Sequence, residues 1–548
     1  MITCMDKLKL NIIALGLSGL ALASCGDSFL DVDPSTSLFD QNYYKTIDDA
    51  EMALIGCYDG YQRTSSNGSQ SFYVTSEVLS DNCFGGTGNT DNRLHQMLDR
   101  FDFSQYPSEN NIFDGTWTDY YAGIFRCNTL ITKLDQINWQ GQDGVRNRIE
   151  GEARFLRAIM YFDLVRLFEK VPLLLEPTTA NVPQAEVADV YKAIAEDLKF
   201  AAENINYPEY SAAWAAENDG RATQWAAKAI LGRVFLFYTG YYNATDLAGV
   251  VDKSYVLTAL ENVIAESKFG LVGEYKNLWE AASSTPDVAN NKLVTTWAGR
   301  GNSEIIFAQK FNFTQDYNGN VDGNRWLVML GLRKTNYAPY GQGWGACTVN
   351  PKLVSSFDVK DARRMASVID AENEGVATAL DLKDQREYTG YYNKKYIPMC
   401  LPDGTTAVTG LGNGDFQISQ YQDYVVMRYA DVLLMAAELG SANAQVYFDQ
   451  VRGRAGLTDK LAPTKENIMA ERRFEFAFEG LRYWDLLRQG LDKAAAIIAE
   501  SDVKLLSGGV DDVVNISAAN ITKTRGFMQI PNNQITLSNG VLKQNAGW

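Results

Sequence analysis

Apolar residues recur every three or four positions in several long segments of the chain, which is the spacing of one face of an α-helix. This pattern predicts amphipathic helices over residues 47–61, 117–134, 149–167, 187–201, 226–241, 255–264, 429–439 and 444–455. Pro172 follows the third segment and ends its helical pattern. We interpret the segments as paired helices and expect a mainly α fold.

Small residues occur on three of these segments, at positions where a neighbouring helix must come close. They are Ala153 and Ala158, Ala229 and Gly232, and Ala430 and Ala436. Stacked helical hairpins need such thin faces, so the pattern favours a tetratricopeptide-like solenoid. The period is irregular and no repeat matches the tetratricopeptide consensus well, so an ordinary all-α domain is the alternative.

Two regions lack the helical pattern. Residues 269–423 are rich in Gly, Asn, Tyr and Trp, with short alternating pieces such as Ser303–Phe311, and residues 65–111 are polar and glycine-rich. Long loops of this kind are usually functional. We therefore expect a helical scaffold over about 40–268 and 424–490, and a ligand site formed by the two loop regions.

The N-terminus has the features of an export signal. An apolar block from Leu10 to Ala23 follows Lys7 and Lys9, and it is shorter than the roughly 20 residues that span a bilayer. Leu22 to Cys25 match the box that is cut before its cysteine in bacterial lipoproteins. Residues 1–24 are therefore predicted to be a lipoprotein signal peptide, with acyl chains on Cys25 as the anchor. An ordinary secretory signal is the alternative, and the true start is Met1 or Met5.

Charge and rare residues exclude several classes of function. The formal net charge is −17, which disfavours nucleic acid and anionic membrane faces as partners. His95 is the one histidine, so histidine zinc sites are excluded and Ser-His or Cys-His catalysis would depend on this residue alone. The cysteines after Cys25 are widely spaced, and a disulfide framework is not expected in so large a chain, while one or two bridges in an exported protein are the alternative.

Several motifs occur in the order found in one known family. They are SCGDSFLD from Ser24, FDQNYYKTIDDAEMAL from Phe39, EARFLRAIMYFDLVRLF from Glu152, RYADVLLMAAE from Arg428, ERRFEFAFEGLRYWDLLRQG from Glu471, and the ending IPNNQI…LKQNAGW. Together they resemble the SusD/RagB family over the whole mature chain. The resemblance implies a single SusD-like domain over residues 25–548, built on tetratricopeptide-like hairpins with an irregular loop-rich region.

The same resemblance implies a role at the cell surface. Members are outer-membrane lipoproteins of Bacteroidota that bind glycans or other nutrients and are not enzymes. They act as a lid over a SusC-like TonB-dependent transporter, which is the protein partner expected here. The family holds its ligand residues to no fixed motif, so the candidate residues below rest on chemistry and location.

Aromatic residues gather in the larger loop region. Exposed rings stack on the apolar faces of sugars, while Asn, Asp, Gln and Arg bind the hydroxyl edges. We predict a glycan site that includes Trp297, Trp326, Trp344, Tyr337 and Tyr340. Trp344 lies between glycines and is expected to be the most exposed ring. For any single ring, a place in the core is the alternative.

The smaller loop region supplies polar candidates. We select Asp81, Asn82, Phe84 and Arg93, which lie around a glycine-rich bend. This bend lacks the preceding strand and the following Lys-Ser/Thr of a phosphate loop. It is therefore predicted to bind sugar rather than nucleotide.

Two further motifs suggest chemistry that we do not favour. Glu475 and Glu479 have the spacing of a glycosidase pair, but the arginines around them would keep both ionised, so we expect a structural ion network. The stretch from Asn318 to Asp322 imitates the start of a calcium loop, but Met329 stands where the closing glutamate is required. An EF-hand is excluded, another calcium site there stays open, and no other cofactor is predicted.

The sequence therefore predicts a lipid-anchored surface protein that captures an oligosaccharide for a SusC-like transporter. A peptide or another non-sugar nutrient is the alternative ligand. A lipid-anchored glycosidase is the alternative from a different class of function.

Overall fold

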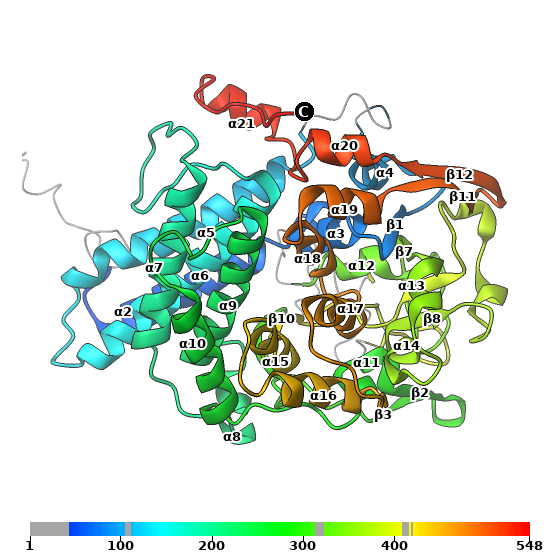
Figure 1. Ribbon diagram of the computed structural model, residues 1–548, viewed down its shortest axis with the longest axis horizontal. Coiled ribbons are helices and arrows are strands. Elements are labelled where there is room, and N and C mark those ends of the chain that lie inside the picture. The colour runs from blue at the N-terminus through cyan, green and yellow to red at the C-terminus, as the bar shows by residue number, and fades with distance from the viewer. Residues whose placement is uncertain (1–42, 103, 105–110, 313–322, 408–415, 418–419) are drawn as a thin grey trace, which may run out of the picture.

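A helical side and a loop-rich side make up the computed structural model, which describes residues 43–102, 104, 111–312, 323–407, 416–417 and 420–548 (Figure 1). Cys25 and the stretch from Asn318 to Asp322 lie outside the described residues. The predictions of a lipid anchor and of a calcium loop therefore stay predictions.

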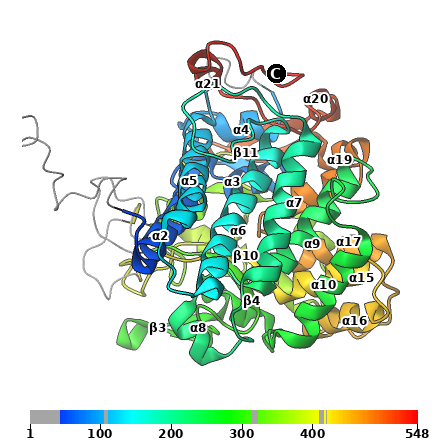
Figure 2. The same ribbon diagram turned by 90° about the vertical axis from the view of Figure 1, so that its left-hand side faces the viewer.

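Six long helices form the helical layer, side by side in Figure 2. They are α2 (Ile47–Arg63), α5 (Asp114–Lys133), α6 (Asp143–Phe168), α7 (Val187–Asn204), α9 (Gln224–Tyr241) and α10 (Lys253–Glu266). Each packs against the next along the chain. The mainly α, hairpin-built fold is confirmed, and the predicted helices are found close to their expected bounds, except that α6 begins at Asp143 rather than at Ile149.

Local sequence explains where these helices begin and how closely they approach. The Thr46 side chain accepts a hydrogen bond from Asp49 N while Asp49 caps the Thr46 N–H, a reciprocal pair that starts α2. Gly60 of α2 meets Gly123 of α5, and a Cβ on Gly123 would lie 3.0 Å from the Gly60 carbonyl oxygen. The absence of side chains at this crossing lets the two backbones touch.

A second group of helices follows the loop-rich region and lies between it and the helical layer (Figure 1). It comprises α15 (Tyr429–Glu438), α16 (Ala444–Arg454), α17 (Lys465–Glu475), α18 (Arg482–Leu487) and α19 (Leu491–Ile498). The chain ends with the hairpin β11 (Glu500–Ser507) and β12 (Val510–Ile516), then α20 (Ala518–Lys523) and α21 (Asn532–Leu537).

Short strands in separate two-stranded pairs organise the loop-rich side. β4 (Ile305–Gln309), the predicted alternating piece, pairs with β10 (Tyr424–Arg428), while β2 (Ser284–Asp287) pairs with β3 (Lys292–Thr295) and β8 (Val368–Asp370) with β9 (Tyr391–Asn393). β5 (Leu332–Arg333) lies parallel to β6 (Gln342–Gly343). Short helices also occur on this side: α11 (Glu280–Ser283), α12 (Leu327–Leu330), α13 (Pro351–Ser356) and α14 (Ala362–Ser367). The short helix α8 (Ala212–Asn218) connects α7 to α9.

The region 65–111 differs from the predicted surface loop. It contains α3 (Phe72–Val78), β1 (Cys83–Gly86) and α4 (Leu94–Asp99), and every residue of these three elements is buried. β1 pairs antiparallel with β7 (Ala346–Val349), so the stretch is covered by a segment far away in the sequence.

Cysteines and hydropathy add two facts about the described chain. Its five cysteines are buried and free. No helix in the described ranges is both long enough and apolar enough to cross a membrane.

Candidate functional site

The predicted aromatic residues divide into buried and accessible rings. Trp326 is fully buried and stacks on Tyr73 with ring centroids 4.1 Å apart. Phe84 and Tyr340 are buried as well, at 1% and 5% exposure. Their burial contradicts the exposed position predicted for these three rings. Trp344, Tyr337 and Trp297 are half-buried and keep an accessible edge.

The predicted polar residues have structural contacts instead of open faces. Asp81 is buried and accepts hydrogen bonds from Arg482, at 2.7 Å and 3.0 Å. Burial opposes ionisation of Asp81, but Arg482 and Arg473 outweigh it and lower its pKa. Asn82 is fully buried and accepts from Arg473 Nε at 3.1 Å. Both were wrongly predicted to be surface ligands, because they tie β1 to α17 and α18.

A cleft of about 290 Å³ opens beside Trp344. Its lining comes from three loop segments and consists of Asn336, Gly341, Gln342, Pro398, Met399, Thr406, Phe416 and Gln420. We call it the Phe416 cleft. Trp344, Trp297, Tyr337 and the exposed Arg93 are all absent from the lining, but the Trp344 ring centroid lies 6.0 Å from that of Phe416, which is a lining residue.

Backbone contacts hold two of the three segments together. Asn336 Oδ1 accepts from Gln342 N at 2.7 Å, and Asn336 Nδ2 donates to the Gly404 carbonyl at 2.9 Å. Gly341 N donates to the Pro398 carbonyl at 2.7 Å, beside a bridge between Tyr340 and Met399. Two of the three walls are therefore held together without a ligand, which lowers the entropy cost of binding.

The glycines around Trp344 were expected to leave its ring exposed, but at Gly343 the structure shows a close backbone contact instead. A Cβ on Gly343 would lie 2.1 Å from the Val328 carbonyl oxygen, so only glycine allows this close approach. Trp344 N donates to the same carbonyl at 2.9 Å. The Trp344 ring then lies 6.0 Å from the Phe416 ring and has the Arg333 guanidinium 5.3 Å from its centroid. The glycines fix the ring beside Phe416 rather than merely uncover it.

The Phe416 cleft combines apolar surface with unused hydrogen-bonding groups. Pro398, Met399 and Phe416 supply carbon surface. Thr406 Oγ1 is shielded from solvent and has no hydrogen-bond partner among the residues that the structure describes. Within the described part of the chain, the Gln342 side-chain amide is also unpaired, although its backbone N–H is bonded. A buried polar group without a partner, such as the Thr406 hydroxyl, is costly, so the site favours a ligand that carries hydroxyl groups.

A second cleft, of about 390 Å³, lies between α2, the loop after α8 and β4. Several of its charged side chains have partners: Lys310 pairs with Asp219 and Asp423, and Asp59 pairs with Arg126. It is larger than the Phe416 cleft.

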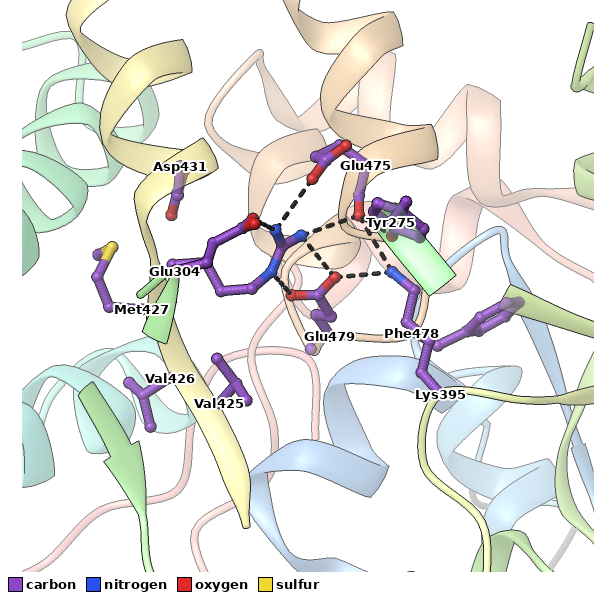
Figure 3. Close-up of polar contacts among 12 residues, drawn as sticks. Tyr275, Glu304, Lys395, Val425, Val426, Met427, Asp431, Glu475, Phe478 and Glu479 are labelled. Carbon is purple, nitrogen blue, oxygen red and sulfur yellow. Dashed lines mark hydrogen bonds and ion pairs between the residues drawn. The ribbon is translucent and has the colours of Figure 1, made fainter. Parts of the chain in front are cut away.

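The carboxylates that resemble a glycosidase pair lie in a buried ion network. Figure 3 shows Glu304, Glu475 and Glu479 converging on one guanidinium, which belongs to Arg428. Burial alone would raise the pKa of Glu475, but Arg454, Arg428 and Arg363 lower it well below its usual range. Lys395 donates to Glu479 at 2.7 Å. The predicted structural network is confirmed, and Glu475 has no proton to give as a general acid.

The described residues contain no candidate metal site. Among them, no three His, Cys, Asp or Glu side chains are grouped so that they could hold a metal ion. His95 is buried, with its Nε2 3.1 Å from the Ser69 carbonyl oxygen, and lies away from the Phe416 cleft lining.

Sequence reasoning missed most of the cleft lining. Gln342, Pro398, Met399 and Thr406 carry no motif, because their proximity depends on pairing between segments about 60 residues apart. Phe416 gave one usable signal, since it follows the glycine-rich stretch GLGNGD.

Two family models match the chain. One is described as the SusD family and matches residues 371–548; the other is described as starch-binding associating with outer membrane and matches residues 28–236. Among curated relatives, SusD-like protein P38 of Formosa agariphila is 25% identical over 523 residues, which cover 88% of this chain and 92% of that protein. A SusD-like protein of Bacteroides ovatus is 23% identical over 515 residues, covering 88% and 82%.

Solved structures agree with these matches. A laminarin binding SusD-like protein is 28% identical with a TM-score of 0.71, over 92% of this chain and 100% of that chain. Surface glycan-binding protein A from Bacteroides thetaiotaomicron, in complex with laminarihexaose, gives a TM-score of 0.73 over the same shares. At 22% identity this second likeness supports the fold alone. From its two matched regions, its relatives and its fold, the chain belongs to the SusD/RagB family.

Proposed function

We propose that this chain is a cell-surface lipoprotein that binds an oligosaccharide in the Phe416 cleft and passes it to a SusC-like TonB-dependent transporter. The observation that carries the proposal is the cleft itself, where the Trp344 and Phe416 rings lie beside the unpaired Thr406 hydroxyl and Gln342 amide. Rings bind the C–H faces of a sugar, and the polar groups bind its hydroxyls.

The size of the cleft defines how much ligand it holds. At about 290 Å³ it is at the lower end of small-molecule sites, roughly 300–1,000 Å³. It therefore accommodates a short part of a glycan chain, with the remainder lying outside. A β-glucan such as laminarin is the first ligand to try, because a similar solved structure is described as laminarin binding.

Calorimetric titration of the purified protein with laminarin, xyloglucan and starch oligosaccharides tests the site. For the glycan that binds best, we expect Trp344→Ala and Phe416→Ala each to weaken binding about tenfold or more, since each removes a stacking surface. Trp297→Ala is the matched control, because Trp297 is half-buried like Trp344 but makes no ring contact with Phe416 in the described structure. Unchanged binding by both cleft variants would place the site elsewhere.

The same titrations separate the alternatives. If the nutrient is not a sugar, the net charge of −17 favours a cationic peptide. Binding of such peptides without binding of any glycan would therefore identify the ligand as a peptide. We propose binding without catalysis, because Glu475 and Glu479 are held ionised in ion pairs with the buried Arg428 and Lys395. Release of new reducing ends from a bound glycan would contradict that.

The anchor and the partner rest on sequence and family. The Leu22-to-Cys25 box supports lipidation of Cys25, and one matching family model describes association with the outer membrane. We expect Cys25→Ala to release the protein from the membrane fraction while leaving glycan binding unchanged. Co-purification with a SusC-like transporter tests the partner. If a variant with substitutions in the helical layer stays in the membrane fraction but no longer co-purifies with the transporter, the helical layer forms the contact.

A further inference from the structure

Helices α2 and α5 touch at two glycines. They lie side by side in Figure 2, and a Cβ on Gly60 of α2 would lie 2.9 Å from the Gly123 Cα of α5. Arg126 of α5 donates to the Gly56 carbonyl at 2.9 Å, so the two helices run antiparallel. Their backbones are closer here than those of an ordinary helix pair, whose axes are about 8–10 Å apart.

Two cysteines face each other one turn along this crossing. Cys57 comes three positions before Gly60, and Cys127 comes four positions after Gly123, which is the same direction in an antiparallel pair. Both cysteines are fully buried, at 0% exposure, and the Cys57 thiol contacts the Cys127 thiol. A disulfide requires Cα atoms within about 7 Å of each other, an approach that the glycine contact favours.

The thiol contact sets this pair apart from two of the other buried cysteines. Cys83 donates to Glu77 Oε2 at 3.8 Å, and Cys400 donates to the Tyr340 carbonyl at 3.1 Å. Their sulfurs therefore contact oxygen, whereas the Cys57 sulfur contacts a second sulfur.

We propose that Cys57 and Cys127, which are free thiols in the structure, are joined by a disulfide in the exported protein. The inference rests on the proposed export, which the Leu22-to-Cys25 box and the family description of outer-membrane association support. Thiols stay reduced in the cytosol, but disulfides form and persist in the compartments that an exported chain enters.

The oxidant is the disulfide of a thiol–disulfide oxidoreductase in that compartment. The Cys57 thiolate attacks this disulfide, which gives a mixed disulfide and releases one thiolate of the oxidant. The Cys127 thiolate then attacks the Cys57 sulfur, closes the bridge and releases the second thiolate. The two cysteines lose two protons to solvent, and two electrons reduce the oxidant to a dithiol.

The reaction belongs to folding rather than to the folded state. The contact with Cys127, together with burial, raises the pKa of Cys57 well above its usual value. A buried thiol of this kind is unreactive, because the thiolate is the nucleophile. The bridge therefore closes before the α2–α5 crossing excludes the oxidant.

The bridge would stabilise the start of the fold. Cys57 and Cys127 are 70 positions apart, and the loop between them contains α3, β1 and α4, whose residues are all buried. A bridge that closes a long loop removes conformational entropy from the unfolded chain. It would also hold α2, the first described helix after the predicted anchor at Cys25, to the rest of the helical layer.

Counting thiols tests the proposal without any variant. The mature chain from Gly26 contains five cysteines. It is exported to the periplasm by a secretory signal peptide, purified from that fraction, unfolded in urea with iodoacetamide and digested for mass spectrometry. We expect three alkylated cysteines and one peptide pair that joins Cys57 to Cys127. Five alkylated cysteines, or a bridge between other cysteines, would overturn the proposal.

Thermal unfolding with and without a phosphine reductant measures the effect of the bridge. We expect the reductant to lower the midpoint by about 2–5 °C. Cys127→Ala should abolish this difference, while Cys83→Ala is the matched control, because it removes another buried cysteine and should keep the difference.

Equal midpoints of the parent protein with and without reductant would also contradict the proposal. Because the protein is taken from the periplasmic fraction, a negative result counts against the bridge and not against export. Neither experiment involves a glycan, so its failure is distinct from failure of the proposed function.

Discussion

His95 shows how burial can remove the acid-base role that its residue type suggests. It lies in α4 at 4% exposure, with Nε2 3.1 Å from the Ser69 carbonyl oxygen, so the neutral ring donates from Nε2. Burial lowers its pKa to about 4, and the positive charge of Arg386 acts in the same direction. The imidazole is therefore neutral at pH 7 and serves packing.

The chain has one histidine, so the titration of His95 can be followed without assignment. We expect a midpoint of about 4 for the ¹³Cε1 resonance of histidine-labelled folded protein. The folded pKa lies below the unfolded value, so the stability it contributes is complete above pH 6.5 and is lost as pH falls through 4. A shift from 6.5 to about 4 corresponds to about 3 kcal/mol.

Urea-unfolded protein is the control for this titration and should show a midpoint near 6.5. A folded midpoint equal to the unfolded one would mean that water reaches His95. The packing of α4 against β1 would then be looser than the structure has it.

Single residues also mark the limit of prediction for the candidate site. Trp326 and Trp344 are 18 positions apart in the same glycine-rich region, and nothing local distinguishes them. Trp326 is covered by Tyr73, Tyr396 and Tyr424, which come from three distant segments. Because the cover is tertiary, composition and spacing could find the right region but not the right ring.

At the scale of elements, the long helices could be predicted and the short strands could not. An amphipathic helix carries its 3.6-residue period within its own sequence, which is why α2, α5 and α6 were located close to their observed bounds. β1 has the sequence CFGG and exists through its pairing with β7, in which Phe84 faces Thr348. Such pairing leaves no local period, so the segment was wrongly predicted to be a surface loop.

The crossing of α2 and α5 gives a prediction about helix packing. A Cβ on Gly123 would lie 2.5 Å from Met160 Sδ as well as 3.0 Å from the Gly60 carbonyl oxygen. We expect Gly123→Ala to lower the free energy of unfolding by about 1–3 kcal/mol, because the α2 backbone and the Met160 side chain must both shift to admit the methyl group. Urea unfolding monitored by circular dichroism measures the change.

Gly144 is the matched control for this substitution. It lies in the first turn of α6, and a Cβ added there would have no heavy atom within 4 Å. Gly144→Ala should therefore be neutral or stabilise by up to about 1 kcal/mol, through helix propensity alone. Equal effects at both positions would mean that the crossing has room to spare.

At the scale of the molecule, buried ion pairs connect the loop-rich side to the C-terminal helices. Arg428, at the end of β10, contacts Glu304, Glu475 and Glu479, while Arg363 of α14 contacts Glu471 and Glu475. The C-terminal helices in turn join the helical layer through Arg233 of α9 and Asp431 of α15. The loop-rich side, the C-terminal helices and the helical layer are thus tied together by charges that unfolding of any one part would leave unpaired.

We therefore expect one cooperative unfolding transition, with Glu475→Gln shifting the whole of it. Removing one partner of a buried ion pair typically costs about 3–5 kcal/mol, because the remaining charges stay buried. Glu196→Gln is the control, since Glu196 and Lys192 form an exposed pair at 3.9 Å that should contribute at most about 0.5 kcal/mol. In differential scanning calorimetry, a second resolved peak in the parent protein, or in the Glu475→Gln variant alone, would mean that the loop-rich side unfolds separately. A single peak that moves to lower temperature with Glu475→Gln and does not move with Glu196→Gln would instead fit one folding unit, in which the loop-rich side, the C-terminal helices and the helical layer depend on the same buried charges.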